Sequence, residues 1–158
     1  MTASSLPTIL IDKREQSALQ FSAAVSTELV TLPVGDYSLR GATDLAAIER
    51  KRLGELAQCC GKDRDRFIDQ LERLRMYPVR ALIIEADLDG VLSKSYRSEI
   101  HPLSVLGTLI KASSDWQIPV WMCGDARNAA LVVERMLLRV HKQRQAQGDA
   151  GRAAELSL

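Results

Sequence analysis

The stretch that decides the fold of this 158-residue chain is Ala47-Ile48-Glu49-Arg50-Lys51-Arg52. Small and apolar residues lead into a carboxylate, a guanidinium and an ammonium, which is typical of a buried strand that ends at the rim of a sheet. Because side chains alternate between the two faces of a strand, we expect Glu49 and Lys51 on one face and Arg50 on the other. An acid and a base side by side at a sheet edge can hold a metal ion together with a phosphate.

A second carboxylate lies thirteen residues upstream, in Gly35-Asp36. We interpret the span 28–51 as a meander of adjacent antiparallel strands, the first of them over 28–32. In that arrangement the chain turns back between Asp36 and Glu49. The two carboxylates are therefore expected to lie close together in space.

The rest of the chain alternates apolar runs with helical periodicity. Thr8-Ile9-Leu10-Ile11 is a continuous apolar run, which predicts a strand covered on both faces. Further strands are expected at 79–86 and 118–123, and helices at 53–60, 63–77, 102–113 and 125–142. Strands interrupted by helices, with a meander in the first half, predict an α/β sandwich with a central mixed sheet.

Length and composition predict one domain over 1–142 and a tail over 143–158 that is mobile or a frayed helix. The net charge of +1 gives no overall positive field, so any surface for nucleic acid must be local. The three cysteines are odd in number and form no CxxC pattern, which favours reduced thiols and a cytoplasmic protein. No apolar run approaches the ~20 residues of a membrane span.

The acids and the lysine suit phosphodiester hydrolysis. That reaction needs an activated water, stabilisation of negative charge and help for the leaving oxygen, and divalent ions held by carboxylates supply all three. Asp36, Glu49 and the backbone carbonyl of Arg50 are candidate ligands, and Asp12 is a candidate for a second ion or for positioning a water. Lys51 is a candidate to orient the water or to stabilise charge. The alternative is a set of ordinary surface charges at strand ends.

Basic residues near these acids are candidates to bind the substrate. Arg14 and Glu15 follow a strand end. Arg14 could bind a phosphate bidentately there, or it could form an exposed ion pair. Arg64 and Arg66 open a predicted helix, and Gln70 lies one turn later. These residues could hold a DNA backbone, although a solvated helix face explains the mild basic excess almost as well.

Five sequence blocks, in this order, resemble the nuclease domain of the XPF family. They are Ile11-Asp12-Lys13-Arg14-Glu15, Leu32-Pro33-Val34-Gly35-Asp36-Tyr37, Ile48-Glu49-Arg50-Lys51, Asp65-Arg66-Phe67-Ile68-Asp69-Gln70 and Ala81-Leu82-Ile83-Ile84-Glu85. The family signature is GD, a spacer and ERKxxxD, and the resemblance covers 8–142. It implies a restriction-endonuclease-like α/β/α sandwich, dependence on Mg²⁺ or Mn²⁺, and cleavage of branched or flap DNA near a duplex junction.

The resemblance also implies roles for single residues. Asp36 and Glu49 match the family's metal ligands, Lys51 its catalytic lysine, Asp12, Arg14 and Glu15 its first block, Arg50 its central arginine, and Arg66 and Gln70 a block that lines the active-site groove. The family aspartate of ERKxxxD is Glu55 here, one methylene longer, so we expect it to support the ligands rather than bind the metal.

The same resemblance implies a homodimer formed through the final strand and helix, here 118–142. The chain lacks the tandem helix-hairpin-helix module of many family members, so it looks like a stand-alone nuclease domain or a fragment, and the preference for branched DNA does not simply transfer. An alternative function is a catalytically silent subunit for DNA binding or dimerisation. The intact Gly35-Asp36 and Glu49-Arg50-Lys51 disfavour that alternative.

Overall fold

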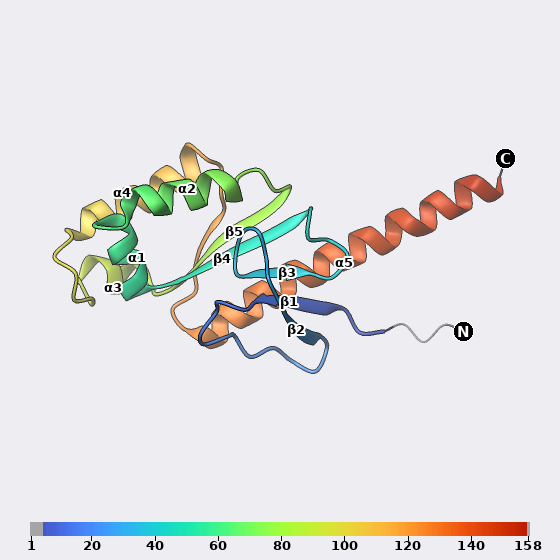
Figure 1. Ribbon diagram of the computed structural model, residues 1–158, viewed down its shortest axis with the longest axis horizontal. Coiled ribbons are helices and arrows are strands. Elements are labelled where there is room, and N and C mark those ends of the chain that lie inside the picture. The colour runs from blue at the N-terminus through green and yellow to red at the C-terminus, as the bar shows by residue number, and fades with distance from the viewer. Residues whose placement is uncertain (1–4, 158) are drawn as a thin grey trace.

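A six-stranded mixed sheet lies between helices in the computed structural model, which describes residues 5–157 (Figure 1). The strands are β1 (Thr8–Asp12), β2 (Ser26–Val30), β3 (Tyr37–Leu39), β4 (Ala46–Arg52), β5 (Val79–Glu85) and β6 (Val120–Met122). The helices are α1 (Leu53–Cys60), α2 (Arg64–Leu74), α3 (Leu88–Leu92), α4 (Pro102–Ser114) and α5 (Ala126–Leu156). This architecture confirms the predicted α/β class with a central mixed sheet.

The strand order in the sheet is β2-β1-β3-β4-β5-β6. Within the described sheet, β3 alone runs antiparallel to its neighbours, and the other strands are parallel to one another. The start of β3 therefore lies at the same edge of the sheet as the ends of β1, β4 and β5. This edge collects the residues that the sequence singled out.

The two faces of the sheet are covered by different helices. Ala46 and Ile48 of β4 join the core beneath α5, whereas Ala47 joins the core beneath α1, α2 and α4. The same alternation holds in β5, where Ile83 faces α5 and Leu82 faces the other side. By the same alternation, Glu49 and Lys51 lie on the face of Ala47, and Arg50 lies on the face of Ile48.

The predicted meander is wrong in its first strand. The strand expected at 28–32 is β2 at Ser26–Val30, and it pairs in parallel with β1 rather than with β3. A parallel pair needs a long connection, and residues 13–25 provide one. The antiparallel pairing of β3 with β4 is confirmed by Tyr37 opposite Ile48.

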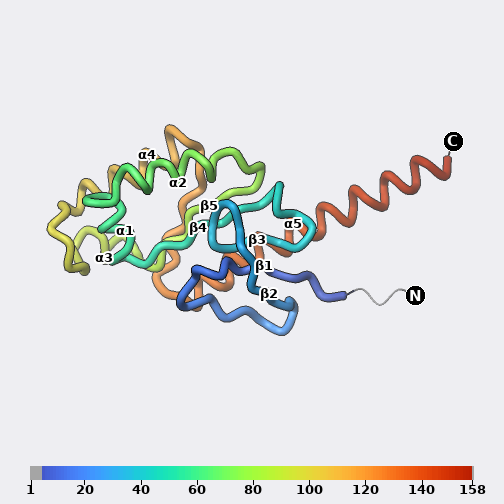
Figure 2. Tube along the Cα trace, in the orientation of Figure 1, coloured from blue at the N-terminus to red at the C-terminus, as the bar shows by residue number. Residues whose placement is uncertain are grey.

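The last helix is longer than predicted. It begins at the expected place, where the Asp125 side chain caps it by accepting a 2.8 Å hydrogen bond from the Asn128 backbone N–H. It then continues through the predicted tail to Leu156 and projects away from the sheet (Figure 2). Gln, Arg and Ala are good helix formers, so two glycines do not end it. Mobility of residues 143–157, which are exposed, stays a prediction.

No helix in the described part of the chain has the length and apolar character needed to cross a membrane.

Candidate active site

Three acids and a lysine from adjacent strand ends share one face of the sheet. Ile9 and Ile11 of β1 point toward α5, so Asp12 points the other way, toward α2. The alternation in β4 puts Glu49 and Lys51 on the same side. Together with Asp36, just before β3, these residues line a cavity of about 240 Å³, which we call the site pocket. Its lining residues are Asp12, Arg14, Pro33, Val34, Gly35, Asp36, Glu49, Lys51, Arg66, Gln70 and Arg73.

Gly35 sets the position of Asp36. Its φ of +78° is one that other residues rarely adopt, and a Cβ added here would lie 2.9 Å from the Ile48 carbonyl oxygen. This close approach lets the Asp36 N–H donate a 2.8 Å hydrogen bond to the Ile48 carbonyl. The Asp36 carboxylate then accepts a 2.9 Å hydrogen bond from the Arg50 N–H. The Gly-Asp pair is therefore fixed to β4 at both its backbone and its side chain.

Burial makes ionisation of both Asp36 and Glu49 costly. Burial, followed by the charge of Glu49, raises the pKa of Asp36 from 3.8 to about 8. Burial likewise raises the pKa of Glu49, which is 8% exposed, although Lys51 opposes the shift. Two half-buried or buried carboxylates on one pocket wall are a strained arrangement that a cation would relieve.

Lys51 supplies the positive charge beside this pair. Its Nζ lies 3.0 Å from Glu49 Oε1 and 5.8 Å from the centre of the Phe67 ring. Burial acts against the ammonium, but Glu49, with Cys59 and Asp36, more than offsets it, so the pKa of Lys51 is raised. The lysine is therefore held in its charged form at the pocket wall.

Both carboxylate oxygens of Asp12 accept hydrogen bonds from neighbouring residues. Its Oδ1 accepts hydrogen bonds from the Arg14 backbone N–H at 2.9 Å and from Arg14 Nε at 2.7 Å. Its Oδ2 accepts from Arg14 Nη2 at 3.1 Å and from the Leu32 N–H at 2.8 Å. The hydrogen bonds from Arg14 hold the pKa of Asp12 at about 2, despite its burial. These hydrogen bonds fix the loop that leads to Gly35, and they leave Asp12 little freedom to bind a metal.

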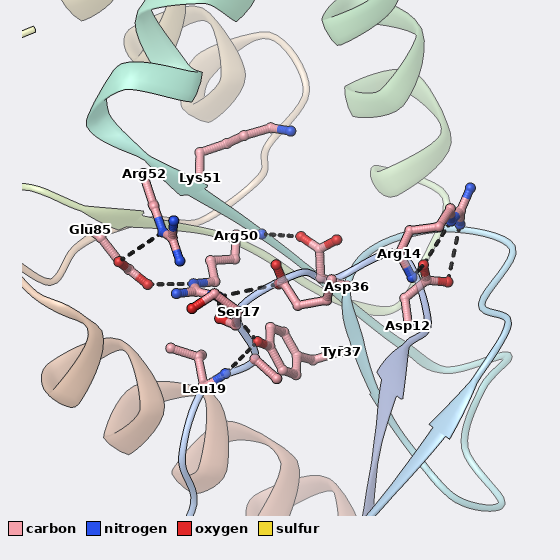
Figure 3. Close-up of polar contacts among 12 residues, drawn as sticks. Asp12, Arg14, Ser17, Leu19, Asp36, Tyr37, Arg50, Lys51, Arg52 and Glu85 are labelled. Atoms are coloured by element: carbon pink, nitrogen blue, oxygen red, sulfur yellow. Dashed lines mark hydrogen bonds and ion pairs between the residues drawn. The ribbon is translucent and has the colours of Figure 1, made fainter.

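The Arg50 side chain leaves β4 on the face opposite to Lys51, as the alternation predicted (Figure 3). Its Nε donates a short hydrogen bond to Glu85 at the end of β5, and its Nη1 donates a 2.6 Å hydrogen bond to the Ser17 carbonyl. Glu15 Oε2 lies 3.4 Å from the same Nη1. The guanidinium is thus part of a buried network behind the pocket, and it contributes to the site through its backbone.

The pocket brings together most of the residues singled out from the sequence, but not all of them. Asp12, Arg14, Asp36, Glu49, Lys51, Arg66 and Gln70 line it, whereas Glu15, Glu55 and the Arg50 side chain do not. Glu15 faces Arg50 instead. Glu55 lies in the first turn of α1, where it accepts a 3.4 Å hydrogen bond from the Arg52 N–H, and it lines a neighbouring pocket with Lys51.

Arg73 also lines the site pocket, although no motif in the sequence singled it out. It lies on α2 at positions i+7 from Arg66 and i+3 from Gln70, so the three side chains share one helix face. That spacing was the signal that could have identified it.

The residues present fit a magnesium-type ion with few protein ligands. No cluster of three or more His, Cys, Asp or Glu suited to a metal ion occurs among residues 5–157. Asp36 and Glu49 each have one carboxylate oxygen outside the hydrogen bonds described above. The Arg50 N–H points to Asp36, and in a strand the carbonyl of a residue points to the same side as its N–H, so the Arg50 carbonyl is a third oxygen. Mg²⁺ tolerates such a set because it keeps several waters.

Comparison with known proteins gives a consistent result. The model of the ERCC4 domain matches residues 11–136. The fold resembles XPF from Aeropyrum pernix in complex with DNA, with a TM-score of 0.69 and 25% identity over 87% of this chain and 66% of that chain. It also resembles XPF from Aeropyrum pernix, with a TM-score of 0.68 and 24% identity over 85% and 61% of the two chains. The chain thus spans just under two thirds of these proteins. The search of curated proteins found no match.

Proposed function

The chain belongs to the ERCC4 domain family, that of the XPF nucleases, and from this premise we propose that it is a divalent-metal-dependent DNA endonuclease. The observation that carries the proposal is that Asp36 and Glu49 line one pocket at the edge where β3 pairs with β4, with Lys51 3.0 Å from Glu49. The family match by itself assigns no role to any residue of this chain. The roles proposed for single residues are supported by where their side chains lie.

Asp36, Glu49 and the Arg50 carbonyl hold Mg²⁺ or Mn²⁺ in this proposal. The bound ion supplies a Lewis acid that polarises the phosphate and lowers the pKa of a water. Asp12 positions the Gly35-Asp36 loop by accepting a hydrogen bond from Leu32. We propose this role for Asp12 in place of metal binding.

Lys51 acts from the pocket wall as a fixed positive charge. Its ammonium group donates hydrogen bonds to the negative charge that develops on the phosphate. The ion pair with Glu49 keeps the ammonium group in place. Arg14 is held by Asp12 and the Leu32 carbonyl through Nε and Nη2, which leaves its Nη1 for a phosphate oxygen. Arg66 and Gln70 contact the DNA backbone from α2.

DNA is the proposed substrate because one of the similar structures is an XPF in complex with DNA. We propose branched, flap or forked DNA, and a role in repair or recombination, on the family resemblance. The alternative function, a catalytically silent DNA-binding or dimerisation subunit, would not need two carboxylates, Asp36 and Glu49, whose burial raises their pKa values.

A homodimer through β6 and α5 is part of the same proposal. β6 is the last strand of the sheet, with its outer edge unpaired in the described chain, and Trp121 within it is 48% exposed. Leu131 on α5 is 57% exposed. Exposed apolar side chains and an open strand edge both favour a protein partner, and we propose a second copy of this chain.

We further propose that residues 1–142 are the nuclease domain and 143–158 a mobile appendage, because side chains of α5 are buried up to Val140 and exposed from Lys142 onward. A cytoplasmic location is proposed because Cys59, Cys60 and Cys123 are all free thiols.

Cleavage of labelled flap and forked DNA with Mg²⁺ or Mn²⁺, with and without EDTA, tests the function. Asp36→Asn and Glu49→Gln should lose more than the roughly 100-fold that removal of a merely supporting residue costs. Asp69→Asn is the matched control, because Asp69 is an exposed acid of α2 outside the site pocket. Wild-type protein that cuts none of these substrates with either metal would leave the silent-subunit alternative.

A further inference from the structure

The site pocket continues into a second cavity along α2. This side pocket, of about 180 Å³, shares Lys51, Arg66 and Gln70 with the site pocket. Since three side chains line both cavities, the two are halves of one groove with Lys51 near its middle. A single DNA strand entering this groove would place the reacting phosphate near Lys51, with one half of the groove on each side of it.

The two halves differ in the charge of the residues that they do not share. Arg14 and Arg73 line only the site pocket, together with Asp12, which pairs with Arg14, and the two carboxylates proposed to bind the metal ion. Glu55 and Asp63 line only the side pocket, which has no basic residue of its own in the described chain. With a metal ion on its two carboxylates, the site-pocket half presents Arg73 to a phosphate, whereas the side-pocket half presents two acids without a cation of their own.

The Arg73 guanidinium is available for a ligand. Within residues 5–157 the structure shows no ion pair or hydrogen bond made by this side chain, and the residue is exposed. Arg73 lies seven residues after Arg66, or about 10.5 Å along the helix axis. The two arginines are thus spaced to contact different phosphates of a strand.

We propose that Arg14 and Arg73 form a second phosphate subsite, which binds the phosphate adjacent to the scissile one, on one side only. The half lined by Glu55 and Asp63 takes no phosphate, so the strand leaves the groove there. This inference rests on the proposed nuclease function and adds a direction: the groove distinguishes the two sides of the cleavage position.

Neutral methylphosphonate linkages, placed singly on either side of the cleaved bond, test the subsite. With wild-type protein and Mg²⁺ we expect about tenfold slower cleavage when the neutral linkage is on one side, and less than about twofold change on the other. Arg73→Gln should cleave native DNA about tenfold more slowly, with no further loss from the neutral linkage on the sensitive side. Arg75→Gln is the control, because Arg75 is an exposed arginine near the end of α2 that lines neither pocket.

The inference is overturned if Arg73→Gln remains as sensitive to the neutral linkage as wild type, or if both sides respond equally. A measurement without catalysis separates this outcome from failure of the nuclease proposal. In EDTA, the slope of log K against log salt for single-stranded DNA should fall by about 0.7 in Arg73→Gln and stay unchanged in Arg75→Gln. Equal slopes would reject the subsite whether or not the protein cleaves DNA.

Discussion

The backbone N–H of Arg50 donates a 2.9 Å hydrogen bond to the carboxylate of Asp36, while the Arg50 side chain binds Glu85 on the opposite face of the sheet. The position of one proposed ligand is thus tied to a buried ion pair that never enters the pocket.

Replacing Glu85 should weaken both the fold and the site. In Glu85→Gln the buried Arg50 guanidinium loses its charged partner, so we expect the free energy of unfolding to fall by about 1–3 kcal/mol in urea titrations. Metal-dependent cleavage should need a higher metal concentration because the Arg50 N–H no longer holds Asp36 as firmly. Arg52→Gln is the control: Arg52 Nε lies 3.9 Å from Glu85 and the side chain is 48% exposed, so the loss should stay within about 1 kcal/mol. Equal effects of the two variants would contradict the argument.

Removing the Asp36 charge should stabilise the metal-free protein at high pH. A folded-state pKa of about 8 lies above the unfolded value, so the stability that protonated Asp36 contributes is complete below about pH 4 and is lost as the pH rises toward 8. Asp36→Asn carries no such charge. Its melting temperature relative to wild type should therefore increase from pH 4 to pH 8, by about 2–4 °C for each kcal/mol. A difference that is constant with pH would show that burial and Glu49 do not hold the proton on Asp36.

Metal binding should release a proton near neutral pH. Below pH 8 the Asp36 carboxyl is largely protonated in the free protein, and a divalent ion displaces that proton. Calorimetric titration with Mn²⁺ in buffers of different ionisation enthalpy should show this release, and the apparent affinity should rise between pH 6 and pH 8. Glu49→Gln should abolish the binding heat, and an affinity independent of pH would argue against the carboxylate pair as the ligand.

Asp12 should stabilise the protein except in strong acid. Its pKa of about 2 lies below the unfolded value, so its contribution is complete above about pH 4 and is lost as the pH falls through 2. The difference in unfolding free energy between wild type and Asp12→Asn should be constant from pH 7 to about pH 4 and shrink below it. Because the carboxylate also holds Leu32, Asp12→Asn should slow cleavage at neutral pH. A difference that stays constant down to pH 2 would mean that Arg14 does not depress the pKa.

The proposed dimer depends on the surface around Leu131. Leu131→Glu should shift the protein from dimer to monomer in sedimentation experiments, because a charge would replace an exposed apolar contact. Leu29→Glu is the control, since Leu29 is 62% exposed on β2 at the far edge of the sheet. Leu138 is a poorer probe because it packs against the core beneath α5, so a charge there would also destabilise the fold. A wild type that is monomeric at the highest concentrations tested would reject the dimer.

Period-2 alternation was enough to predict which face each residue of β4 occupies. Glu49 and Lys51 share the pocket face and Arg50 lies behind it, as expected from the sequence. The prediction succeeded because local extended geometry fixes side-chain direction whatever the strand pairs with. The pairing of β3 with β4 was predictable for a similar reason, because the two strands are close in sequence and Asp36 hydrogen-bonds directly to Ile48.

Contacts between distant segments were not predictable in the same way. The parallel pairing of β2 with β1 depends on how residues 13–25 cross the sheet, and no periodicity in β2 indicates it. For Arg14 the sequence left open a phosphate contact or an ion pair, and no local pattern indicated that the partner would be Asp12. The helix through 143–156 has no buried side chains, so hydrophobic patterning carried no signal for it.

The tight approach of Gly35 to Ile48 means that the site is vulnerable to a change that removes no charge at all. A single added methyl at position 35 would push Asp36 off β4 while every acid and base of the motif remained in the sequence. Such a chain would keep all the charged residues of the motif but would lose the position of Asp36 that the proposed metal site needs. The glycine is therefore as informative a marker of activity as the carboxylates when related sequences are sorted into active and silent members.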